Sequence, residues 1–234
     1  MALATETEAE LARLRGGLVV SCQAREGNLL HGPAFMAAMA EAAVLGGAVG
    51  IRADGPADIA AIRARVPVPI LGIQKVEDAE GSIFITPDVA TATAVLDAGA
   101  RLVALDGTRR PRPGGADLRA VIAAIHDRGG AALADVSTLD EGRYAATCGA
   151  DLVGTTLSGY TPDSPRLAGP DLDLVRALVA NCPVPVFAEG RYWEPAQAAA
   201  ALAAGAAFVV VGTAITNPLE ITRRFVGALA GRGA

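Results

Sequence analysis

Val68-Pro69-Ile70-Leu71-Gly72-Ile73-Gln74-Lys75 is a short apolar run that ends on a lysine. A run of this kind is typical of a strand that is buried in a parallel sheet. Lys75 is the only lysine of the chain, because the other nineteen of its 20 basic residues are arginine. A desolvated lysine can lose its proton and act as a base or nucleophile, whereas arginine stays charged in proteins. The run therefore predicts a buried strand that ends on an amine suited to proton transfer.

Glycine marks the boundary between helix and strand along the chain. Five Ala/Leu-rich helical segments end in glycine and lead into an apolar run, at Gly46-Gly47, Gly99, Gly129-Gly130, Gly149 and Gly205. Glycine adopts the left-handed conformation that ends a helix at little steric cost. Each of these segments therefore predicts a helix followed by a strand.

The whole chain alternates strands and helices. The eight expected strands are Leu18–Cys22, Ala48–Arg52, Pro69–Gln74, Leu102–Asp106, Ala131–Asp135, Leu152–Thr155, Val184–Ala188 and Phe208–Val211. The eight expected helices are Pro33–Leu45, Pro56–Arg65, Pro87–Ala98, Ala116–Arg128, Leu139–Thr147, Asp171–Asn181, Glu194–Ala204 and Leu219–Ala230. Pro33, Pro56 and Pro87 suit the first turns of their helices.

This order of elements predicts an α/β fold, a (β/α)8 TIM barrel with an extra N-terminal helix within residues 1–15. Residues 1–234 are expected to form a single domain, since no linker interrupts the alternation. A doubly wound open sheet is the alternative, but no GxGxxG follows the first strand, where a dinucleotide-binding fold would need it.

The composition restricts the partners of the protein. A net charge of −5 lacks the basic surface that nucleic acids or anionic membranes require. No apolar run reaches the ~18 residues of a membrane span. Cys22, Cys148 and Cys182 are widely spaced without a CxxC pair, which favours buried free thiols in a reducing compartment. We therefore expect a cytoplasmic protein that binds neither nucleic acid nor membrane.

The ends of the expected strands carry the candidate chemistry, because the reacting groups of a (β/α)8 barrel come from the C-terminal ends of its strands. These ends are Cys22-Gln23, Arg52, Gln74-Lys75, Asp106, Asp135, Thr155-Thr156, Glu189-Gly190-Arg191 and Gly212-Thr213. Strand ends meet solvent, so some charges there need no functional explanation. Exposure to solvent does not explain why the only lysine and a glutamate that follows three apolar residues are both expected at the same opening of the barrel. Lys75 and Glu189 are therefore the candidate catalytic residues.

The last two strands indicate a phosphate site. Gly190-Arg191 follows one strand, and Gly212-Thr213 follows the next with a short helix start behind it. Backbone N–H groups and helix starts at this place in a barrel commonly bind phosphate. We therefore expect a phosphorylated small molecule. Two long segments, Val76–Thr86 and Ser158–Pro170, also follow strands and are expected at the same face.

Histidine gives no sign of metal chemistry. His31 and His126 are the only histidines, and neither has a carboxylate or a second histidine at ligand spacing. His126 falls within an expected helix away from the mouth, whereas His31 follows the first strand and is left open as a substrate contact. Neither a metal site nor a Ser-His-Asp arrangement is expected.

A set of short segments is spread over most of the chain. They are Val20–Ala24, Leu30–Pro33, Gly50–Arg52, Pro69–Lys75, Ile85–Pro87, Ala104–Thr108, Arg110–Pro113, Ala134–Thr138, Ala188–Tyr192 and Val211–Thr216. With them the chain resembles the N-acetylmannosamine-6-phosphate 2-epimerase family, from about Gly16 to the last helix. The resemblance implies an isomerase of carbohydrate metabolism that interconverts N-acetylmannosamine 6-phosphate and N-acetylglucosamine 6-phosphate in the catabolism of sialic-acid-derived amino sugars.

The resemblance also implies roles for individual residues, a homodimer, and proton transfer at C2 without a metal or redox cofactor. The implied roles are Lys75 as base and acid, Glu189 in proton delivery or sugar binding, Gln23, Arg52 and Asp135 at the substrate, and Gly190, Arg191, Gly212 and Thr213 at the phosphate. A base near C2 and donors near O1 are what such a reaction needs, since the developing enolate must be stabilised.

Two positions depart from the family pattern. Asn217 precedes Pro218 where the family usually carries arginine, and Val76 follows Lys75 where the family tends to carry a basic residue. These losses of charge leave a changed substrate open. A lysine Schiff-base aldolase and a barrel that binds a sugar phosphate without turning it over are the alternative functions.

Overall fold

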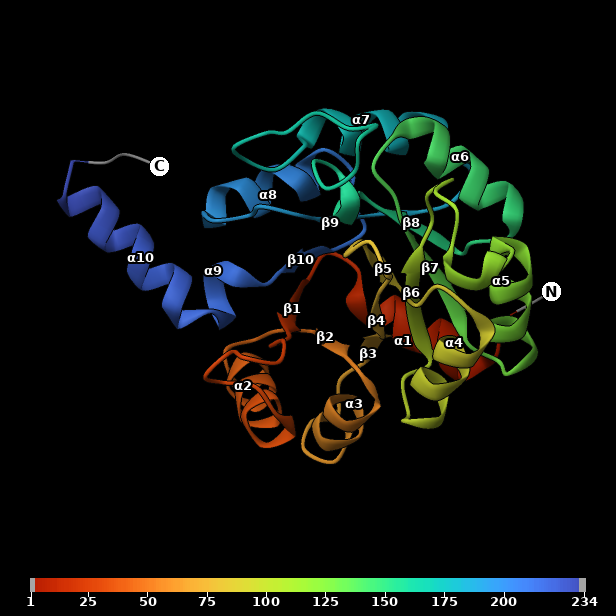
Figure 1. Cartoon of the computed structure of the whole chain (residues 1–234), viewed down its shortest axis with the longest axis horizontal. Helices are drawn as coiled ribbons and strands as arrows, with labels where there is room; N and C mark the ends of the chain where they lie inside the picture. The colour runs from red at the N-terminus through yellow and green to blue at the C-terminus, as the bar shows by residue number, and fades with distance from the viewer. Residues whose placement is uncertain (1–2, 232–234) are drawn as a thin grey trace.

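The strands form one closed barrel in the computed structural model, which describes residues 3–231 (Figure 1). They are β1 (Leu18–Cys22), β2 (Gly50–Asp54), β3 (Ile70–Ile73), β6 (Leu102–Asp106), β7 (Ala131–Asp135), β8 (Leu152–Gly154), β9 (Val186–Glu189) and β10 (Val209–Val211). All neighbouring pairs are parallel, and β1 pairs with both β2 and β10. The predicted (β/α)8 TIM barrel is confirmed, and the open-sheet alternative is wrong.

The helices surround the barrel, as Figure 1 shows. They are α2 (Pro33–Leu45), α3 (Pro56–Arg63), α4 (Val89–Asp97), α5 (Leu118–Asp127), α6 (Leu139–Cys148), α7 (Leu172–Asn181) and α8 (Pro195–Ala203). One expectation was wrong, because Pro87 lies before α4 rather than in its first turn. Asp88 is the N-cap and accepts a hydrogen bond from the Thr91 N–H at 2.8 Å, so the helix begins after it.

Successive side chains along each strand point alternately into the barrel and toward the helices, so the hydrophobic core has two layers. Side chains of one phase fill the barrel interior, where Phe187 and Phe208 stack with ring centroids 5.3 Å apart. Side chains of the other phase pack under the helices, as Ile51 and Val153 do. Gly154 faces the stacked rings, and a Cβ there would lie 2.1 Å from Phe187, so only glycine leaves them room.

The N-terminal helix α1 (Thr5–Leu14) closes the barrel at the end opposite the expected site. Leu14 is fully buried within the interior cluster, and the Thr7 hydroxyl donates to the Gly129 carbonyl at 2.6 Å. The extra helix expected within residues 1–15 is therefore present. Residues 1–2 of that segment, and residues 232–234 of the expected domain, lie outside the described residues.

The segment after Lys75 is a β-hairpin rather than a plain loop. β4 (Lys75–Glu77) pairs antiparallel with β5 (Ile83–Ile85), and Lys75 lies opposite Ile85. At the base, the Thr86 N–H donates to the Gln74 carbonyl at 2.8 Å. Lys75 thus leaves the barrel strand and at once enters a second hydrogen-bonded element, which limits its backbone motion.

Three free cysteines are present among the described residues. Cys22 and Cys148 are buried as expected, but Cys182 is only half-buried, because it ends α7 at the surface. Within residues 3–231, no helix combines the length and the apolarity that crossing a membrane requires.

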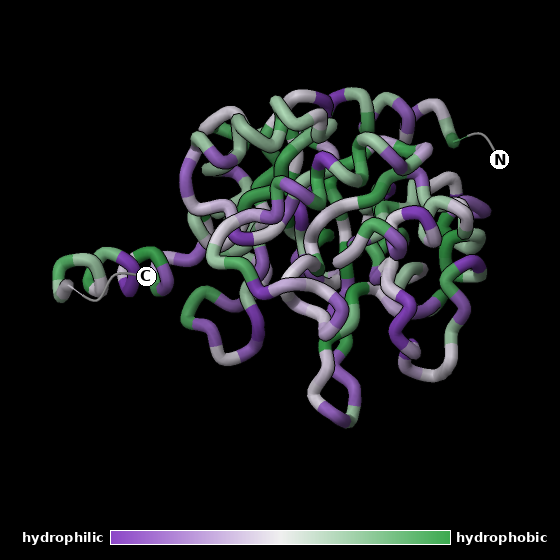
Figure 2. The backbone as a smooth tube through the Cα atoms, turned by 90° about the horizontal axis from the view of Figure 1, so that it is seen from above, coloured by the Kyte–Doolittle hydropathy of each residue, from purple (hydrophilic) through white to green (hydrophobic). Residues whose placement is uncertain are grey.

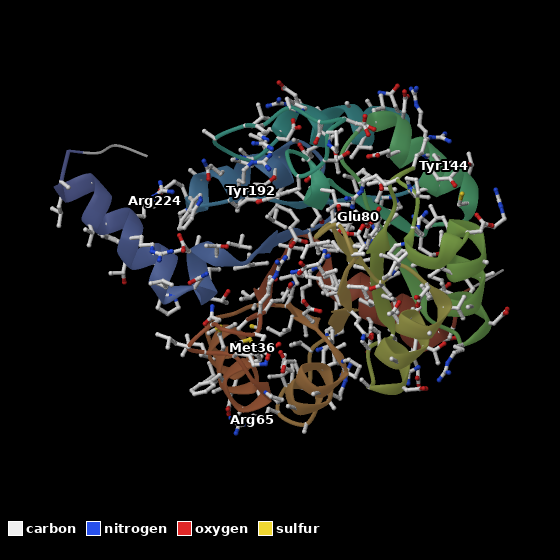
Figure 3. All side chains as sticks on the ribbon, in the orientation of Figure 1. Met36, Arg65, Glu80, Tyr144, Tyr192 and Arg224 are labelled. Carbon is white, nitrogen blue, oxygen red and sulfur yellow. The ribbon has the colours of Figure 1, made fainter. Side chains whose placement is uncertain are left out.

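The last helix, α10 (Pro218–Leu229), leaves the barrel after the short helix α9 (Thr213–Thr216). Figure 1 and Figure 2 both show α10 extending beyond the ring of helices instead of lying between α8 and α2. No residue of α10 is buried. Arg224 reaches from it toward α8, where its guanidinium lies 4.7 Å from the Trp193 ring centroid and 2.9 Å from Glu194 (Figure 3).

Candidate active site

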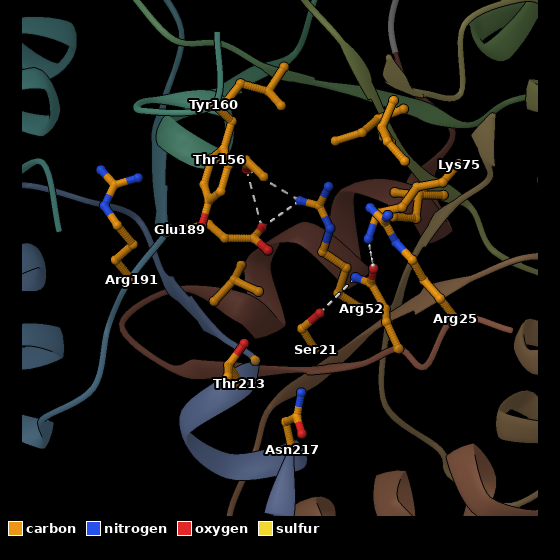
Figure 4. A pocket seen from close by; sticks show the side chains of 18 of the residues that line it. Ser21, Arg25, Arg52, Lys75, Thr156, Tyr160, Glu189, Arg191, Thr213 and Asn217 are labelled. Carbon is orange, nitrogen blue, oxygen red and sulfur yellow. Dashed lines mark hydrogen bonds and ion pairs between the residues drawn. The ribbon is translucent and has the colours of Figure 1, made fainter. Parts of the chain in front are cut away.

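A cavity of about 920 Å³ opens at the C-terminal ends of the strands, where the sequence places the site (Figure 4). Eight of the nine expected residues line it, namely Gln23, Arg52, Lys75, Glu189, Gly190, Arg191, Gly212 and Thr213. The exception is Asp135, which is fully buried and lies behind Arg52 instead of facing the cavity. The strand ends are therefore brought together as expected, with one of them one layer deeper.

The amine of Lys75 is held by two strand ends. Its Nζ donates to Oε1 of Gln23, whose Nε2 in turn donates to the Ser21 hydroxyl at 2.7 Å. Asp54 contacts Lys75 twice, since Oδ1 accepts from the backbone N–H at 2.9 Å and Oδ2 lies 3.8 Å from Nζ. The amine is fixed in the mouth with about a quarter of its side chain exposed.

The surroundings of Lys75 favour its neutral form. Burial lowers the pKa of the ammonium group, and the guanidinium groups of Arg52 and Arg25 lower it further. The carboxylates of Asp54 and Glu189 act in the opposite direction, but the pKa remains below that of an ordinary lysine. The lowered pKa shifts the equilibrium toward the unprotonated amine, which is the form that general base catalysis needs.

Arg52 joins the two carboxylates of the site. It binds Asp135 through two bonds, Nη1 to Oδ1 at 3.0 Å and Nη2 to Oδ2 at 2.6 Å, and Nη1 also binds Oε2 of Glu189 at 2.5 Å. Burial alone would lower the pKa of the guanidinium, but the two carboxylates raise it above its ordinary value. The Thr156 hydroxyl lies among the three groups and bonds both Asp135 and Glu189.

Glu189 has a backbone held by hydrogen bonds and a buried carboxyl group, and burial disfavours the charged form of that group. Its backbone N–H donates to the Thr155 hydroxyl at 3.1 Å, and that hydroxyl donates to the Glu189 carbonyl at 2.8 Å. Burial raises the pKa of the carboxyl group, and Asp135 raises it further, against the opposing effect of Arg52 and Lys75. A raised pKa makes the carboxyl group a better proton acceptor than an ordinary glutamate, which suits a role in proton transfer.

The glycine loops line the opposite side of the cavity from Lys75 (Figure 4). Gly190 has φ 114°, a conformation that favours glycine, and the next residue, Arg191, is also left-handed with φ 57°. Gly212 leads into α9, whose Thr216 hydroxyl donates to the Ser21 carbonyl at 2.8 Å. Backbone groups of two loops are thus presented to the cavity from fixed positions.

The side chain of Arg191 does not point freely at a ligand. Its Nε donates to the Gly169 carbonyl at 2.8 Å, and Nη1 donates to the Ser158 carbonyl. These bonds hold both ends of the Ser158–Pro170 segment. Arg191 therefore braces a wall of the cavity with most of its donors, and mainly its backbone is left for a phosphate.

The two departures from the family pattern fall in different places. Asn217 lines the cavity beside Thr213, and its Oδ1 accepts from the Glu220 N–H at 3.2 Å, which caps α10. Val76 lies in the hairpin opposite Phe84 and does not line this cavity. Of these two positions, only Asn217 lies in the wall of the cavity.

Asp54 is a functional candidate that was not among the expected strand ends, whereas Thr156 was among them but was given no role. Alternation supplies a signal for Asp54, because Gly50, Arg52 and Asp54 lie on the same face of β2. Thr156 was expected directly after the strand, and the structure places it in a 3₁₀ helix, η2 (Thr155–Leu157), which begins at the last residue of the expected strand. Arg25 and Tyr160 also line the cavity and were not predicted.

The two histidines lie in different parts of the structure. His126 lies on α5 with Nε2 2.8 Å from Oδ2 of Asp151, away from the residues of the mouth. His31 is exposed and lines a second, smaller cavity beside the first. Its Nδ1 lies 2.8 Å from the Ala24 carbonyl.

Comparison with known proteins assigns the family. The family model described as "Putative N-acetylmannosamine-6-phosphate epimerase" matches residues 36–231. The chain belongs to this family. A relative from Caldanaerobacter subterraneus named "Putative N-acetylmannosamine-6-phosphate 2-epimerase" is 48% identical over 218 residues, 92% of each chain. One of the same name from Cutibacterium acnes is 48% identical over 226 residues, 95% of this chain and 98% of the relative.

Solved structures agree with this family. The N-acetylmannosamine-6-phosphate 2-epimerase from Clostridium perfringens superposes with a TM-score of 0.91 at 42% identity, over 93% of this chain and 95% of that one. The named members are carbohydrate epimerases, which belong to the isomerases. Thiamine phosphate pyrophosphorylase from Pyrococcus furiosus, with a TM-score of 0.59 at 20% identity over 91% of this chain and 92% of that one, shares the barrel fold alone.

Proposed function

We propose that the protein interconverts N-acetylmannosamine 6-phosphate and N-acetylglucosamine 6-phosphate by moving the proton at C2. The observation that carries this proposal is the position of Lys75. The only lysine of the chain lies in the barrel mouth, held by Gln23 and Asp54, with its pKa lowered by burial. The names of the family members support the substrate, and a place in the breakdown of sialic-acid-derived amino sugars follows from it.

The reaction begins on the open-chain aldehyde. Neutral Lys75 takes the proton from C2, the electrons of the C–H bond form a C1–C2 double bond, and the carbonyl electrons move onto O1. This negative charge develops in a mouth where Arg52 is a fixed, fully buried cation, so it forms at lower cost than in water. Lys75 acts as base and acid, and Glu189, whose pKa is raised by burial, completes proton delivery to the planar intermediate.

The remaining residues hold the substrate. Gln23 orients the amine and reaches the sugar hydroxyls, while Asp135 acts through Arg52, because it is buried behind the guanidinium. The phosphate binds at the far side, on the backbone N–H groups around Gly190 and Arg191 and on those of Gly212 and Thr213. Glycine at two of these four positions lets the anion approach the backbone closely.

Proton exchange at C2 tests the proposal directly. The protein is incubated with N-acetylmannosamine 6-phosphate in deuterium oxide, and NMR follows the C2 proton and the appearance of the epimer. We expect exchange with epimer formation, abolished in Lys75→Arg and Lys75→Ala and retained in Arg176→Ala, which changes an exposed ion pair on α7. Absence of exchange in the parent protein, with binding intact, would contradict the proposed activity. A borohydride-trapped adduct on Lys75 would instead indicate Schiff-base chemistry.

We propose further that the protein is a homodimer. Phe225, Val226 and Leu229 are 69%, 58% and 89% exposed and lie on one face of α10, since Leu229 follows Val226 by three residues and Phe225 by four. Neither α8 nor α2 covers this face, because α10 extends away from the barrel (Figure 1). An exposed apolar helix face of this kind is typical of an interface, and a second copy of the chain offers the same face in return.

Sedimentation velocity tests the homodimer. The parent protein is expected to give a sedimentation coefficient that corresponds to twice the chain mass. Phe225→Asp is expected to lower the sedimentation coefficient toward that of the monomer. Arg223→Ala is the matched control, because it removes an exposed charge from the same helix and leaves the apolar face intact. A parent protein that sediments as a monomer would contradict the proposal. The cytoplasmic location and the single domain over residues 1–234 stay predictions.

A further inference from the structure

The end of β6 carries a group of polar residues that the proposed mechanism does not use. Asp106 is the last residue of the strand and is 1% exposed. Its Oδ1 accepts from the N–H and the hydroxyl of Thr108, at 2.9 and 2.6 Å, and its Oδ2 accepts from Nη2 of Arg110 at 2.6 Å. Nε of Arg110 donates to the Thr108 hydroxyl at 3.3 Å. A buried carboxylate thus sets the direction of the guanidinium.

The guanidinium of Arg110 reaches the hairpin that begins at Lys75. Its Nη2 also donates to the Ile83 carbonyl at 3.2 Å, and its central carbon lies 4.5 Å from the centroid of the Phe84 ring. Both residues belong to β5, the strand that pairs with Lys75–Glu77. We call Asp106, Thr108 and Arg110 the arginine clamp, because they bind one strand of the hairpin to the end of β6.

The hairpin is thus held from both sides of β3, which pairs with β2 on one side and with β6 on the other. Asp54, at the end of β2, accepts from the Lys75 backbone, whereas Arg110 holds β5 from the side of β6. The bonds between Gln74 and Thr86 join the two arms of the hairpin to each other. Arg110 therefore supplies a link between the hairpin and β6.

Ile83 is the place where this link affects the amine. It lines both cavities of the mouth, as Lys75 does, so it is part of the wall beside the amine. Ile85 is buried in the barrel interior and fixes the base of the hairpin, but Ile83 is only half-buried. Without the bond from Arg110, the hairpin is free to tilt about this base, which opens the wall to water.

We propose that Arg110 is a positioning residue, which holds the hairpin so that the Lys75 amine stays buried where it meets C2 of the substrate. The effect on turnover rests on the proposed function, whereas the effect on the amine does not. Arg110 itself lines the first cavity, but Asp106 and Phe84 line neither cavity. Substitutions of Asp106 and Phe84 therefore act through Arg110 and not through contact with a ligand.

The pKa of Lys75 measures the position of the amine without any substrate. Burial has the largest effect on this pKa and lowers it. The charged groups that act on it most are those of Asp54, Arg52, Arg25 and Glu189. None of these four belongs to the arginine clamp. An amine that gains water when the hairpin tilts must therefore titrate at a higher pKa, closer to the ~10.4 of an ordinary lysine.

Titration of the single lysine tests the clamp. The protein is labelled with ¹³C-lysine, which gives one side-chain signal, and NMR follows this signal with pH. In Asp106→Asn, the amide oxygen can still accept from Thr108, but the acceptor for Arg110 is lost. We expect the pKa of Lys75 to rise in this variant. Loss of a carboxylate would by charge alone lower that pKa, so a rise reports movement of the amine.

Arg109→Ala is the matched control. Arg109 is an exposed arginine on the same loop, but its guanidinium lies 4.0 Å from the centroid of the Tyr144 ring on α6, and it does not line the first cavity. We expect this variant to keep the pKa of Lys75 and the turnover of the parent protein. Thermal unfolding shows whether each variant is folded. Phe84→Leu, which keeps an apolar side chain and removes the ring beside Arg110, replaces Asp106→Asn where that variant does not fold.

Steady-state kinetics separate positioning from contact with the substrate. In Asp106→Asn, kcat for epimerisation should fall about tenfold or more, because the base is misplaced, whereas KM should stay within about threefold, because the phosphate is held by the glycine loops. Arg110→Lys should lie between this variant and the parent protein. Its ammonium group can bind Asp106 but lacks the planar fork that also reaches the Ile83 carbonyl.

The outcomes distinguish the clamp from the proposed function. An unchanged pKa of Lys75 in folded Asp106→Asn or Phe84→Leu would overturn the clamp. A raised KM with an unchanged pKa would also overturn it and would make Arg110 a substrate contact. A parent protein that does not epimerise the sugar phosphate, but whose Lys75 pKa rises in Asp106→Asn, would contradict the proposed function and support the clamp.

Discussion

The carboxylate of Asp54 holds Lys75 by two separate contacts, one to its backbone and one to its amine. The oxygen that accepts from the Lys75 N–H at 2.9 Å fixes the start of the hairpin, whereas the oxygen 3.8 Å from Nζ acts only through its charge. Substitution by asparagine can separate the two, because its amide oxygen still accepts from the backbone while the charge is lost.

Asp54→Asn is expected to move the acid limb of the pH–rate profile to lower pH. The Asp54 carboxylate raises the pKa of Lys75, so its removal lets the amine lose its proton at a lower pH. The profile of kcat/KM for C2 exchange measures this shift. Glu80→Gln, at the exposed hairpin tip, is the control and should leave the limb in place. A limb that moves to higher pH would contradict the role assigned to the carboxylate.

Lys75→Met is expected to change the pH dependence of stability. The folded-state pKa of Lys75 is below the ~10.4 of an unfolded lysine, so between these two values the unfolded chain binds more protons. The stability of the parent protein relative to Lys75→Met must therefore rise with pH across this window. Urea unfolding at several pH values measures it, and a difference that stays constant or falls with pH would count against the lowered pKa.

Asp135→Ala is expected to destabilise the fold by ~3–5 kcal/mol, the usual cost of leaving a buried charge without its partner. Arg52 is 1% exposed and would lose both bonds to Asp135, keeping only Glu189 and Thr156. Urea unfolding gives the free energy. Asp173→Ala, which breaks an exposed ion pair with Arg176, is the control and should have no measurable effect. Equal behaviour of the two variants would mean that Arg52 finds another partner.

Asn217→Arg is expected to change binding and stability in opposite directions. The guanidinium would add a cation beside the glycine loops and lower KM for the sugar phosphate several-fold. The loss of the cap on the Glu220 N–H should cost about 1 kcal/mol and lower the melting temperature. Steady-state kinetics and thermal unfolding measure the two effects. An unchanged KM would place the phosphate away from α9.

The sequence was sufficient for those elements whose limits are local. β1, β6, β7 and α2 have the predicted bounds, because each is a mainly apolar run that starts directly after glycine or arginine. β8 is shorter than predicted, since the Thr155 hydroxyl is tied to the backbone of Glu189 and the chain turns there. These bonds join residues that are 34 positions apart, so no local sequence pattern predicts them.

The same distinction applies to the site. Lys75 and Glu189 could be found from strand ends, because a barrel brings all such ends to one mouth. That Asp135 lies behind Arg52 could not, since it depends on a partner 83 residues away. The direction of α10 also escaped prediction, because an amphipathic helix of this kind can pack on its own barrel or on another chain.

The single lysine gives the protein a property that neither its fold nor its reaction requires. Every other basic side chain is arginine, so a reagent that modifies primary amines has one side-chain target, in addition to the N-terminal amine. Because the pKa of Lys75 is lowered, that target is also more nucleophilic at neutral pH than an ordinary lysine. Reductive methylation with ¹³C-formaldehyde would place one side-chain NMR label in the mouth of the barrel, and its chemical shift would report occupancy and protonation there.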